Sequence, residues 1–260
     1  MAAPTYKIVI IGSGNVATQL SLALQKSKHA IVQVYSKHTS SARNLAKKLD
    51  CDFTTSPDKI ISTADIYIIA VKDDAIVEVA GQLKLKDRVV VHTSGSVEMN
   101  VLKGTSKNYG VFYPLQTFSK KNKIDFKSIP VCLEANNSIT FKILQSLAKS
   151  ITLNVQKINS GQRKIIHLAA VFACNFTNHL YTIASDILTS ANVSFDILKP
   201  VIAETANKIK SSAPRETQTG PAIRNDKKII DRHLKMLSDK KQYQQIYKLI
   251  SKNIEETFKK

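Results

Sequence analysis

The sequence predicts an α/β fold: a doubly wound, mostly parallel sheet over residues 1–158, followed by an all-α C-terminal domain over residues 159–260. Three observations predict it. Residues 7–11 form an apolar run that leads directly into a glycine-rich turn and a helical pattern. Similar apolar runs then alternate with helical segments, as they do in a parallel sheet covered by helices. Beyond Asn159-Ser160-Gly161 the apolar residues recur only at three-and-four spacing, which indicates helices.

The first predicted strand, residues 7–11, is followed by the motif Gly-x-Gly-x-x-Ala, and a helix begins within the motif. In such a turn Gly12 permits the tight bend, Gly14 lets the backbone approach a pyrophosphate, and Ala17 allows close packing of helix on strand. Free amides at the helix N-terminus would meet the anion. The sequence therefore predicts dinucleotide binding by Gly12, Ser13, Gly14, Asn15, Val16 and Ala17.

The second predicted strand, residues 30–35, ends in a polar loop that bears on the choice of cofactor. An acidic residue at this distance from the glycines accepts the ribose hydroxyls of NAD, whereas NADP needs cations or hydroxyl groups there. The chain has Ser36 and Lys37 and no acid, which suits a 2′-phosphate and predicts NADP (NADPH). In the alternative interpretation the loop is solvated, with Thr39 or Ser40 capping a helix that ends at Leu49.

A short strand is expected at residues 52–54 and a buried parallel strand at residues 65–71. Loops at the carboxyl ends of such strands line the ligand crevice. We therefore expect Val71, Lys72 and Asp73 to lie near the second ribose and the nicotinamide. Alternatively, Asp73 or Asp74 only caps the helix predicted over residues 75–83.

Strands are also predicted at residues 88–92 and within 110–118, and both end in polar residues where the site should be. Ser94 and Gly95 offer a hydroxyl and amides to the cofactor, while Tyr113 and Gln116 offer hydrogen bonds to a substrate. The alternative for residues 92–94 is a strand end followed by a helix cap. Strands at 129–134 and 153–158 bracket a helix over 138–150 and complete the alternation.

The remaining chain predicts four helices, over residues 162–188, 195–211, 227–238 and 240–258. The last helix carries a continuous apolar stripe, which indicates packing on its own domain or on a second subunit. The stripe is formed by Tyr243, Ile246, Tyr247, Ile250, Ile254 and Phe258.

The long helix from Gln162 carries the candidate catalytic residues. His167, Cys174 and Asn178 fall near one face at 100° per residue, with Asn175 to its side. With Asn175 or Asn178 as its orienting partner, His167 could exchange a proton with a substrate carbonyl or imine. The alternative is a satisfied core histidine.

The turn at residues 219–226 carries one further candidate. Arg224 could hold an anionic group of the substrate. Alternatively, these residues form only a turn, with Asn225 or Asp226 as the cap of the next helix.

The composition restricts the partners. Thirty-eight Lys and Arg against 20 Asp and Glu leave a formal charge of +18, but the lysines are scattered and not interleaved with aromatics, so no nucleic-acid partner is expected. No apolar stretch is long enough to span a membrane and no signal peptide precedes the first strand, which predicts a cytoplasmic protein without a membrane partner. Three separated cysteines predict neither disulfides nor a metal site, and each is expected to be buried.

Several segments together resemble one uncharacterised bacterial family. They are the glycine motif, His92-Thr93-Ser94-Gly95, Tyr113-Pro114-Leu115-Gln116-Thr117-Phe118, the helical segment over residues 167–176, and Thr219-Gly220-Pro221 with Arg224 and Asp226. Members of this family, labelled NADP oxidoreductases, join a Rossmann-like domain to a helical domain of unknown function. The resemblance covers nearly the whole chain, with one departure. The family commonly has His-Pro-Leu-Gln, and this chain has Tyr113 in place of the histidine.

More distantly, the layout is similar to pyrroline-5-carboxylate reductases, coenzyme F420-dependent NADP reductases and β-hydroxyacid dehydrogenases. In the last group a catalytic lysine lies six residues beyond a glycine, and here Gly161 is followed six residues later by His167. Such relatives often dimerise through the helical domain, so the resemblance implies a homodimer.

The function expected from these observations is NADP(H)-dependent hydride transfer to or from a small carbonyl, hydroxyl or imine substrate bound between the domains. The rival expectation is an NADP(H)-binding sensor or scaffold without turnover.

Overall fold

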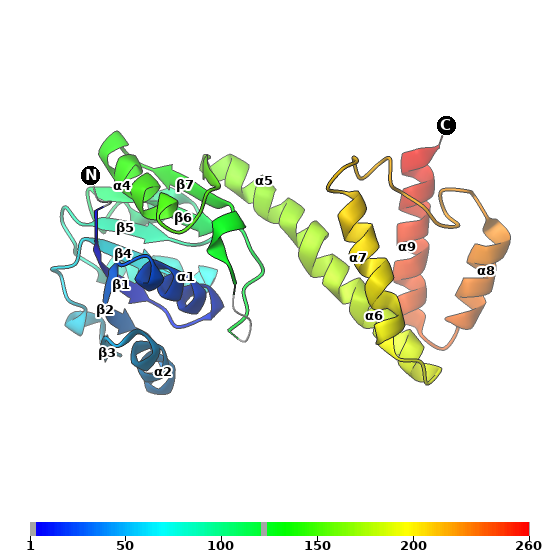
Figure 1. The fold of residues 1–260 in the computed structure, drawn as a ribbon, viewed down its shortest axis with the longest axis horizontal. Helices are drawn as coiled ribbons and strands as arrows, with labels where there is room; N and C mark the ends of the chain where they lie inside the picture. The colour runs from blue at the N-terminus through cyan, green and yellow to red at the C-terminus, as the bar shows by residue number, and fades with distance from the viewer. Residues whose placement is uncertain (1–3, 121–123, 260) are drawn as a thin grey trace. The chain divides into compact units, whose positions relative to one another are not determined.

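The computed structural model describes residues 4–120 and 124–259 (Figure 1). The chain forms two compact units, Met1–Cys174 and Asn175–Lys260. The predicted boundary at residue 158 follows the change from strands to helices, whereas the compact units divide within a helical segment. The first helix after the sheet belongs to the first unit, since its Arg163 contacts the loop after the strand at Val89–His92 and its His167 contacts Tyr113 of that unit's sheet.

The first unit contains an eight-stranded sheet, and the predicted mostly parallel arrangement is confirmed. The strand order is β3-β2-β1-β4-β5-β6-β7-β8, and among the described residues only the β6–β7 pair is antiparallel. The first two strands pair in parallel, which requires a crossover connection, and a helix between them provides it. The strands are β1 Lys7–Ile11, β2 Ala30–Tyr35, β3 Asp52–Thr54, β4 Ile66–Ile69, β5 Val89–His92, β6 Asn108–Pro114, β7 Val131–Ala135 and β8 Val155–Lys157.

Helices cover both faces of this sheet, as a doubly wound fold requires. Side chains alternate along β1, so Ile8 and Ile10 join one core while Val9 and Ile11 join the other. The first core includes residues of α1 (Asn15–Lys26), α2 (Thr39–Leu49) and α4 (Ser138–Lys149), and the second includes residues of α3 (Asp73–Gln82). Burial on both faces explains why the central strands β1 and β4 are nearly continuously apolar.

Short 3-10 turns connect several of these elements. They are η1 Pro57–Lys59, η2 Met99–Leu102 and η3 Phe126–Ser128 in the first unit and η5 Phe195–Leu198 in the second.

Two of the predicted helix caps were wrong. The N-cap position of α2 is His38, without a side-chain cap, because the helix already begins at Thr39. The N-cap of α3 is Lys72, so Asp73 and Asp74 lie in the first turn, where their charges complement the helix dipole. The predicted cap of α8 is confirmed, since Asp226 accepts a hydrogen bond from the Ile229 amide at 3.2 Å.

The single long helix predicted over residues 162–188 is interrupted. It consists of α5 (Ser160–Ala170), the π-helical segment η4 (Val171–Phe176) and α6 (Thr177–Ser190). A π-helix bonds i to i+5 and turns less per residue than an α-helix. The prediction that His167, Cys174 and Asn178 share one face at 100° per residue therefore does not hold across this segment.

The second unit is helical, as predicted. After α6 it contains α7 (Lys199–Lys208), α8 (Lys227–Met236) and α9 (Lys241–Phe258). Most of the stripe on α9 lines an apolar hollow together with Leu180, Ile183 and Ile187 of α6, so it faces another helix of its own unit without being fully buried there.

The cysteines differ from one another in exposure. Cys132 is buried, as expected, and Cys51 is partly buried, but Cys174 is exposed because it lies on the π-helical segment rather than under the sheet. Among the described residues, no helix is long and apolar enough to cross a membrane. The same residues contain no cluster of three His, Cys, Asp or Glu side chains suited to a metal ion.

Candidate functional site

The turn between β1 and α1 has two glycines with different requirements. Gly12 has φ +121°, and a Cβ at this position would lie 2.3 Å from the Ala70 carbonyl oxygen, so a larger residue fits neither the conformation nor the space. At Gly14 a Cβ would meet nothing within 4 Å. Gly12 is thus required by the fold, while Gly14 leaves open space beside the backbone, as a bound phosphate needs.

The N-terminus of α1 suits an anion. Its N-cap is Gly14, no described side chain caps it, and the first turn contains no acidic residue. The amides of the first turn are therefore available to a phosphate at the positive end of the helix dipole.

A cavity of about 600 Å³ extends from this turn along the carboxyl ends of the neighbouring strands. It brings together eleven of the twelve predicted cofactor residues; the exception is Ala17, a buried residue of α1 whose small size allows the helix to pack closely on the sheet. The cavity is lined by Gly12, Ser13, Gly14, Asn15, Val16, Ser36, Lys37, His38, Ala70, Val71, Lys72, Asp73, Ala75, Val79, Thr93, Ser94, Gly95, Tyr113, Pro114, Gln116, Phe118 and His167.

Hydroxyl groups and a lysine meet at the β2 end of this cavity. The Ser13 hydroxyl donates to the Ser36 hydroxyl at 2.9 Å, so the glycine turn and the loop after β2 lie together. Lys37 lies beside them, and its ammonium group forms an exposed ion pair with Glu78 at 2.8 Å. The pair raises the pKa of Lys37 through the hydrogen bond and charge of Glu78, so the lysine is positively charged at neutral pH.

The loop after β4 places Val71, Lys72 and Asp73 at the cavity. The Asp73 carboxylate accepts a hydrogen bond from the Ser96 hydroxyl, which belongs to the loop after β5. The predicted cap role of Asp73 is therefore replaced by a contact between two loops of the site.

Ser94 organises the loop after β5. Its hydroxyl accepts hydrogen bonds from the amides of Ser96 at 3.1 Å and Val97 at 3.0 Å, and the residue is buried. The alternative interpretation of residues 92–94 expected a helix cap, but this hydroxyl closes a turn that precedes η2.

At the far end of the cavity, Tyr113 of β6 meets His167 of α5. The Tyr113 hydroxyl lies 3.1 Å from His167 Nδ1, and the two rings are edge to face with centroids 6.2 Å apart. Burial raises the pKa of Tyr113 to about 12, with a smaller contribution from Cys132. The phenol keeps its proton at neutral pH, so its hydroxyl can donate to an Nδ1 without a proton or accept from an Nδ1 that carries one.

Gly95 packs directly against this histidine. A Cβ on Gly95 would lie 2.6 Å from His167 Nδ1, so only glycine allows the ring its present position. Glycine is needed at position 95 because the imidazole lies so close, not because of the backbone conformation.

Gln116 also lines the cavity, but its side chain is turned toward its own loop. The Gln116 side-chain oxygen accepts hydrogen bonds from the Thr117 amide at 2.7 Å and the Thr117 hydroxyl at 3.2 Å. The loop is held to α1, since Asn15 donates to the Phe118 carbonyl at 3.0 Å and Gln19 to the Ser119 carbonyl at 2.6 Å.

The other predicted site residues lie in the second compact unit. Asn175 and Asn178 are exposed on the π-helical segment and α6, and Arg224 is exposed in the turn before α8. Their proposed roles stay predictions. The partner that the structure shows on His167 Nδ1 is Tyr113, which the sequence suggested only as a substrate contact.

Sequence analysis missed Arg163. It is completely buried, its NH1 group donates to the Ser94, Gly95 and Val97 carbonyls, and its NH2 group pairs with Glu134 at 3.1 Å. A signal was present, since Arg163 precedes His167 by four residues and so shares its helix face.

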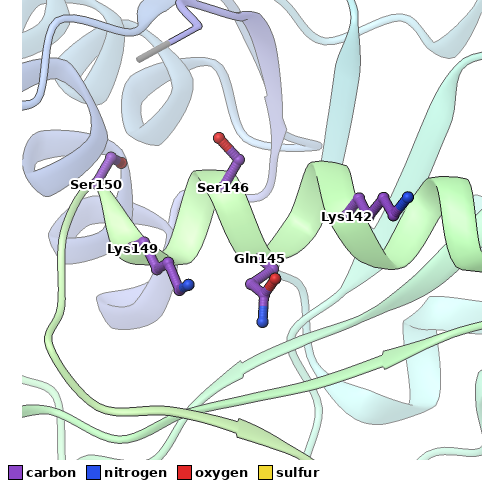
Figure 2. A pocket seen from close by; sticks show the side chains of 5 residues that line it. All are labelled: Lys142, Gln145, Ser146, Lys149 and Ser150. Atoms are coloured by element: carbon purple, nitrogen blue, oxygen red, sulfur yellow. The ribbon is translucent and has the colours of Figure 1, made fainter. Parts of the chain in front are cut away.

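A second hollow, of about 320 Å³, lies along α4 (Figure 2). It is lined by Lys142, Gln145, Ser146, Lys149 and Ser150, all from this helix or its C-cap. Lys142 and Lys149 are exposed, the other three side chains are partly exposed, and the hollow contains none of the predicted site residues.

The fold and the cavity define the class of protein. A doubly wound sheet whose first turn has an open glycine at an uncapped helix N-terminus fits the pyrophosphate of a dinucleotide, and the hydroxyl groups with Lys37 fit a 2′-phosphate. A histidine at the end of the same cavity adds a group that can exchange a proton.

Comparison with known proteins agrees with this class. Residues 7–95 match the family model described as NADP oxidoreductase coenzyme F420-dependent, and residues 129–254 match a domain of unknown function (DUF2520). A solved structure from Bacteroides fragilis, titled "putative NADP oxidoreductase", is 44% identical, with a TM-score of 0.93 over 97% of this chain and 98% of that one. No curated protein matches.

Two more distant structures share the fold. The 1-pyrroline-5-carboxylate reductase of Streptococcus pyogenes is 13% identical, with a TM-score of 0.65 over 97% of this chain and 99% of that one. An imine reductase from Myxococcus stipitatus, solved with NADP⁺, is 14% identical, with a TM-score of 0.64 over 97% and 93%.

The chain therefore belongs to the NADP oxidoreductase family of the Bacteroides fragilis protein, in which a Rossmann-like domain precedes the domain of unknown function. The family resemblance seen in the sequence is confirmed, and so is NADP as the cofactor.

Proposed function

We propose that this protein transfers hydride between NADP(H) and a small substrate with a carbonyl or imine bond, and that His167 exchanges the accompanying proton. The observation that carries the proposal is the Tyr113–His167 pair at the end of the cavity that the glycine turn begins. A proton-exchanging group and a dinucleotide site within one cavity are what such a reaction needs.

Different residues would bind the cofactor and exchange the proton. Gly14 and the α1 amides would hold the pyrophosphate, while Ser36 and Lys37 would hold the 2′-phosphate. NADPH, when bound, supplies a hydride to the substrate carbon. His167 would give a proton to the substrate oxygen or nitrogen, so that the double bond is reduced by one hydride and one proton.

Tyr113 would orient the histidine in both protonation states. It donates to Nδ1 of the neutral imidazole, and its oxygen can accept from Nδ1–H of the imidazolium. In either state Nε2 is the nitrogen left for the substrate. Gln116 and Arg224 are proposed as substrate contacts, Arg224 for an anionic group.

The test is to replace His167 with Ala, with His179→Ala as the control for an exposed histidine. NADPH binding is measured by calorimetry, and turnover is measured as NADPH consumption with 1-pyrroline-5-carboxylate, a cyclic imine and a series of ketones. We expect His167→Ala to lower kcat at least about a hundredfold with NADPH affinity unchanged. Undiminished turnover would contradict the role of His167. Tight NADPH binding without turnover of any such compound would favour the sensor.

A further inference from the structure

The loop that faces His167 is held from beneath by a buried arginine. Arg163 of α5 has no exposed surface, and its NH1 group lies 3.1 Å from the Ser94 carbonyl, 3.2 Å from the Gly95 carbonyl and 2.8 Å from the Val97 carbonyl. One end of the planar guanidinium thus holds three backbone carbonyls of this short loop in place.

The charge of Arg163 is compensated on its other side. NH2 lies 3.1 Å from a Glu134 carboxylate oxygen and 2.9 Å from the Ser160 hydroxyl, and that hydroxyl donates to the same carboxylate at 2.8 Å. Glu134 belongs to β7 and Ser160 to the first turn of α5. The arginine therefore connects the sheet, the helix and the loop at one point.

The loop that Arg163 fixes is the one that limits the histidine. Gly95 leaves so little space that a Cβ there would lie 2.6 Å from His167 Nδ1 and 2.7 Å from Cγ. Arg163 and His167 are four residues apart on α5, so they project from the same face of that helix. A shift of the Gly95 backbone would consequently change the space available to the imidazole.

We propose that Arg163 is a positioning residue for His167: it fixes the Gly95 backbone against the imidazole and so holds Nδ1 at the Tyr113 hydroxyl. The proposal rests on the function proposed above for His167 and names the group that determines the orientation of its ring. Arg163 itself has no exposed surface and does not line the cavity.

The first arm of the test measures the histidine directly, without any substrate. In protein labelled with ¹⁵N-histidine, the nitrogen shifts of His167 show which ring nitrogen carries the proton, and the signal is assigned by its loss in His167→Asn. In the wild-type protein we expect the proton on Nε2. Arg163→Lys keeps a positive charge beside Glu134 but loses the three-carbonyl contact, and we expect it to shift the tautomer ratio and the pH titration of His167.

Two further variants keep this arm decisive. Ser160→Ala removes one partner of Arg163 and should produce a smaller change of the same sign, so it replaces Arg163→Lys if that variant fails to fold. Gly95→Ala leaves Arg163 in place and should displace the ring directly. Lys164→Ala is the matched control, since Lys164 adjoins Arg163 but forms an exposed pair with Glu98.

Unchanged His167 shifts in a folded Arg163→Lys or Ser160→Ala variant would overturn the proposal, even if the melting temperature falls. The second arm is turnover, where we expect kcat to fall about tenfold in Arg163→Lys with little change in KM or NADPH affinity. Because the first arm needs no turnover, absence of activity in the wild type would refute the proposed function without deciding the role of Arg163.

Discussion

Lys37 lines the cavity, and its ammonium group is already paired with a carboxylate. It pairs with Glu78 of α3, and both side chains are more than half exposed, so a 2′-phosphate would compete with a carboxylate for the same ammonium group. An exposed pair of this kind contributes little to folding. The pair bears on the choice between NADP and NAD, because Lys37 and the nearby Ser13 and Ser36 hydroxyls together suit a 2′-phosphate.

We predict that wild-type protein binds NADPH at least about tenfold more tightly than NADH. Lys37→Ala should reduce this ratio by weakening NADPH alone, because NADH lacks the 2′-phosphate that the ammonium group would meet. Titration calorimetry with both cofactors measures the ratio. Lys84→Ala, at an exposed lysine outside the cavity, should leave it unchanged, and equal losses for both cofactors in Lys37→Ala would refute the assignment.

His92 is a second residue whose surroundings determine its charge. It is fully buried at the end of β5, its Nδ1 accepts from the Ser94 amide at 3.2 Å, and its Nε2 donates to the Glu98 carbonyl at 3.4 Å. Burial, and secondarily the charge of Arg163, lowers the pKa of His92 from 6.5 to about 4. The folded protein therefore contains a neutral His92 above that value.

This lowered pKa predicts acid sensitivity. Below pH 6.5 the unfolded chain binds a proton at His92, whereas the folded protein does so only near pH 4, so stability is full above pH 6.5 and falls as the pH drops toward 4. The loss from this group should be about 3 kcal/mol. Thermal unfolding across this range should show a smaller decrease for His92→Gln than for wild type. An identical decrease in both proteins would contradict the prediction.

At the scale of elements, one glycine of the β1–α1 turn is required for folding and the other leaves space for a ligand. Gly12 has a positive φ and leaves no room for a Cβ beside the Ala70 carbonyl, whereas Gly14 borders open space. Both positions are glycines of one motif, but they differ in backbone conformation and in what surrounds them.

We predict opposite outcomes for the same substitution at these glycines. Gly12→Ala should destabilise the fold by at least about 2 kcal/mol, through backbone strain and overlap with the Ala70 carbonyl just after β4. Gly14→Ala should leave the melting temperature nearly unchanged but weaken NADPH binding at least about tenfold, since its methyl group occupies the space a phosphate needs. Calorimetry and thermal unfolding measure both. Tight NADPH binding by Gly14→Ala would place the pyrophosphate elsewhere.

The α5–α6 region shows where helical periodicity fails as a guide. The apolar spacing correctly indicated helix throughout, but the π-helical segment Val171–Phe176 changes the angle per residue. Hydrophobic spacing averaged over a long window does not reveal one widened turn. For this reason, the partner of His167 could not be deduced from positions further along the same helix.

At the scale of the whole molecule, the second unit has little core of its own. Its buried hydrophobic residues among those described are Ile183, Ala222 and Leu237, while Val201 and Leu249 are 61% and 70% exposed. A small unit that buries so few apolar side chains gains little stability from its own packing. Association with a second copy would cover such faces.

We therefore predict a homodimer through the helical unit. Light scattering during gel filtration should give twice the 28.8 kDa mass of one chain. Val201→Glu or Leu249→Glu should lower the dimer fraction if its residue lies in the interface, because a buried charge without a partner is unfavourable. Lys252→Ala, on an exposed face of α9, is the control. A monomer at micromolar concentration would refute the prediction.

Much of the fold follows from local patterns. The strands come from continuous apolar runs, and the glycine motif locates the cofactor turn, because residues 7–17 contain both the apolar strand and the small residues that the turn requires. The carboxyl ends of the parallel strands then gather Ser36, Val71 and Ser94 at one edge of the sheet. Parallel geometry makes that gathering predictable without coordinates.

The sequence alone therefore determined the class of the fold and the cofactor, and it predicted the edge of the sheet at which we propose that the cofactor binds. The tertiary structure alone decided the pairing of Tyr113 with His167, the close approach of Gly95 and the burial of Arg163 beneath the same loop. The physical reason is range: strand and turn propensities act between near neighbours in the chain, whereas these contacts join β6, the loop after β5 and α5, which only the packing of helix on sheet brings together.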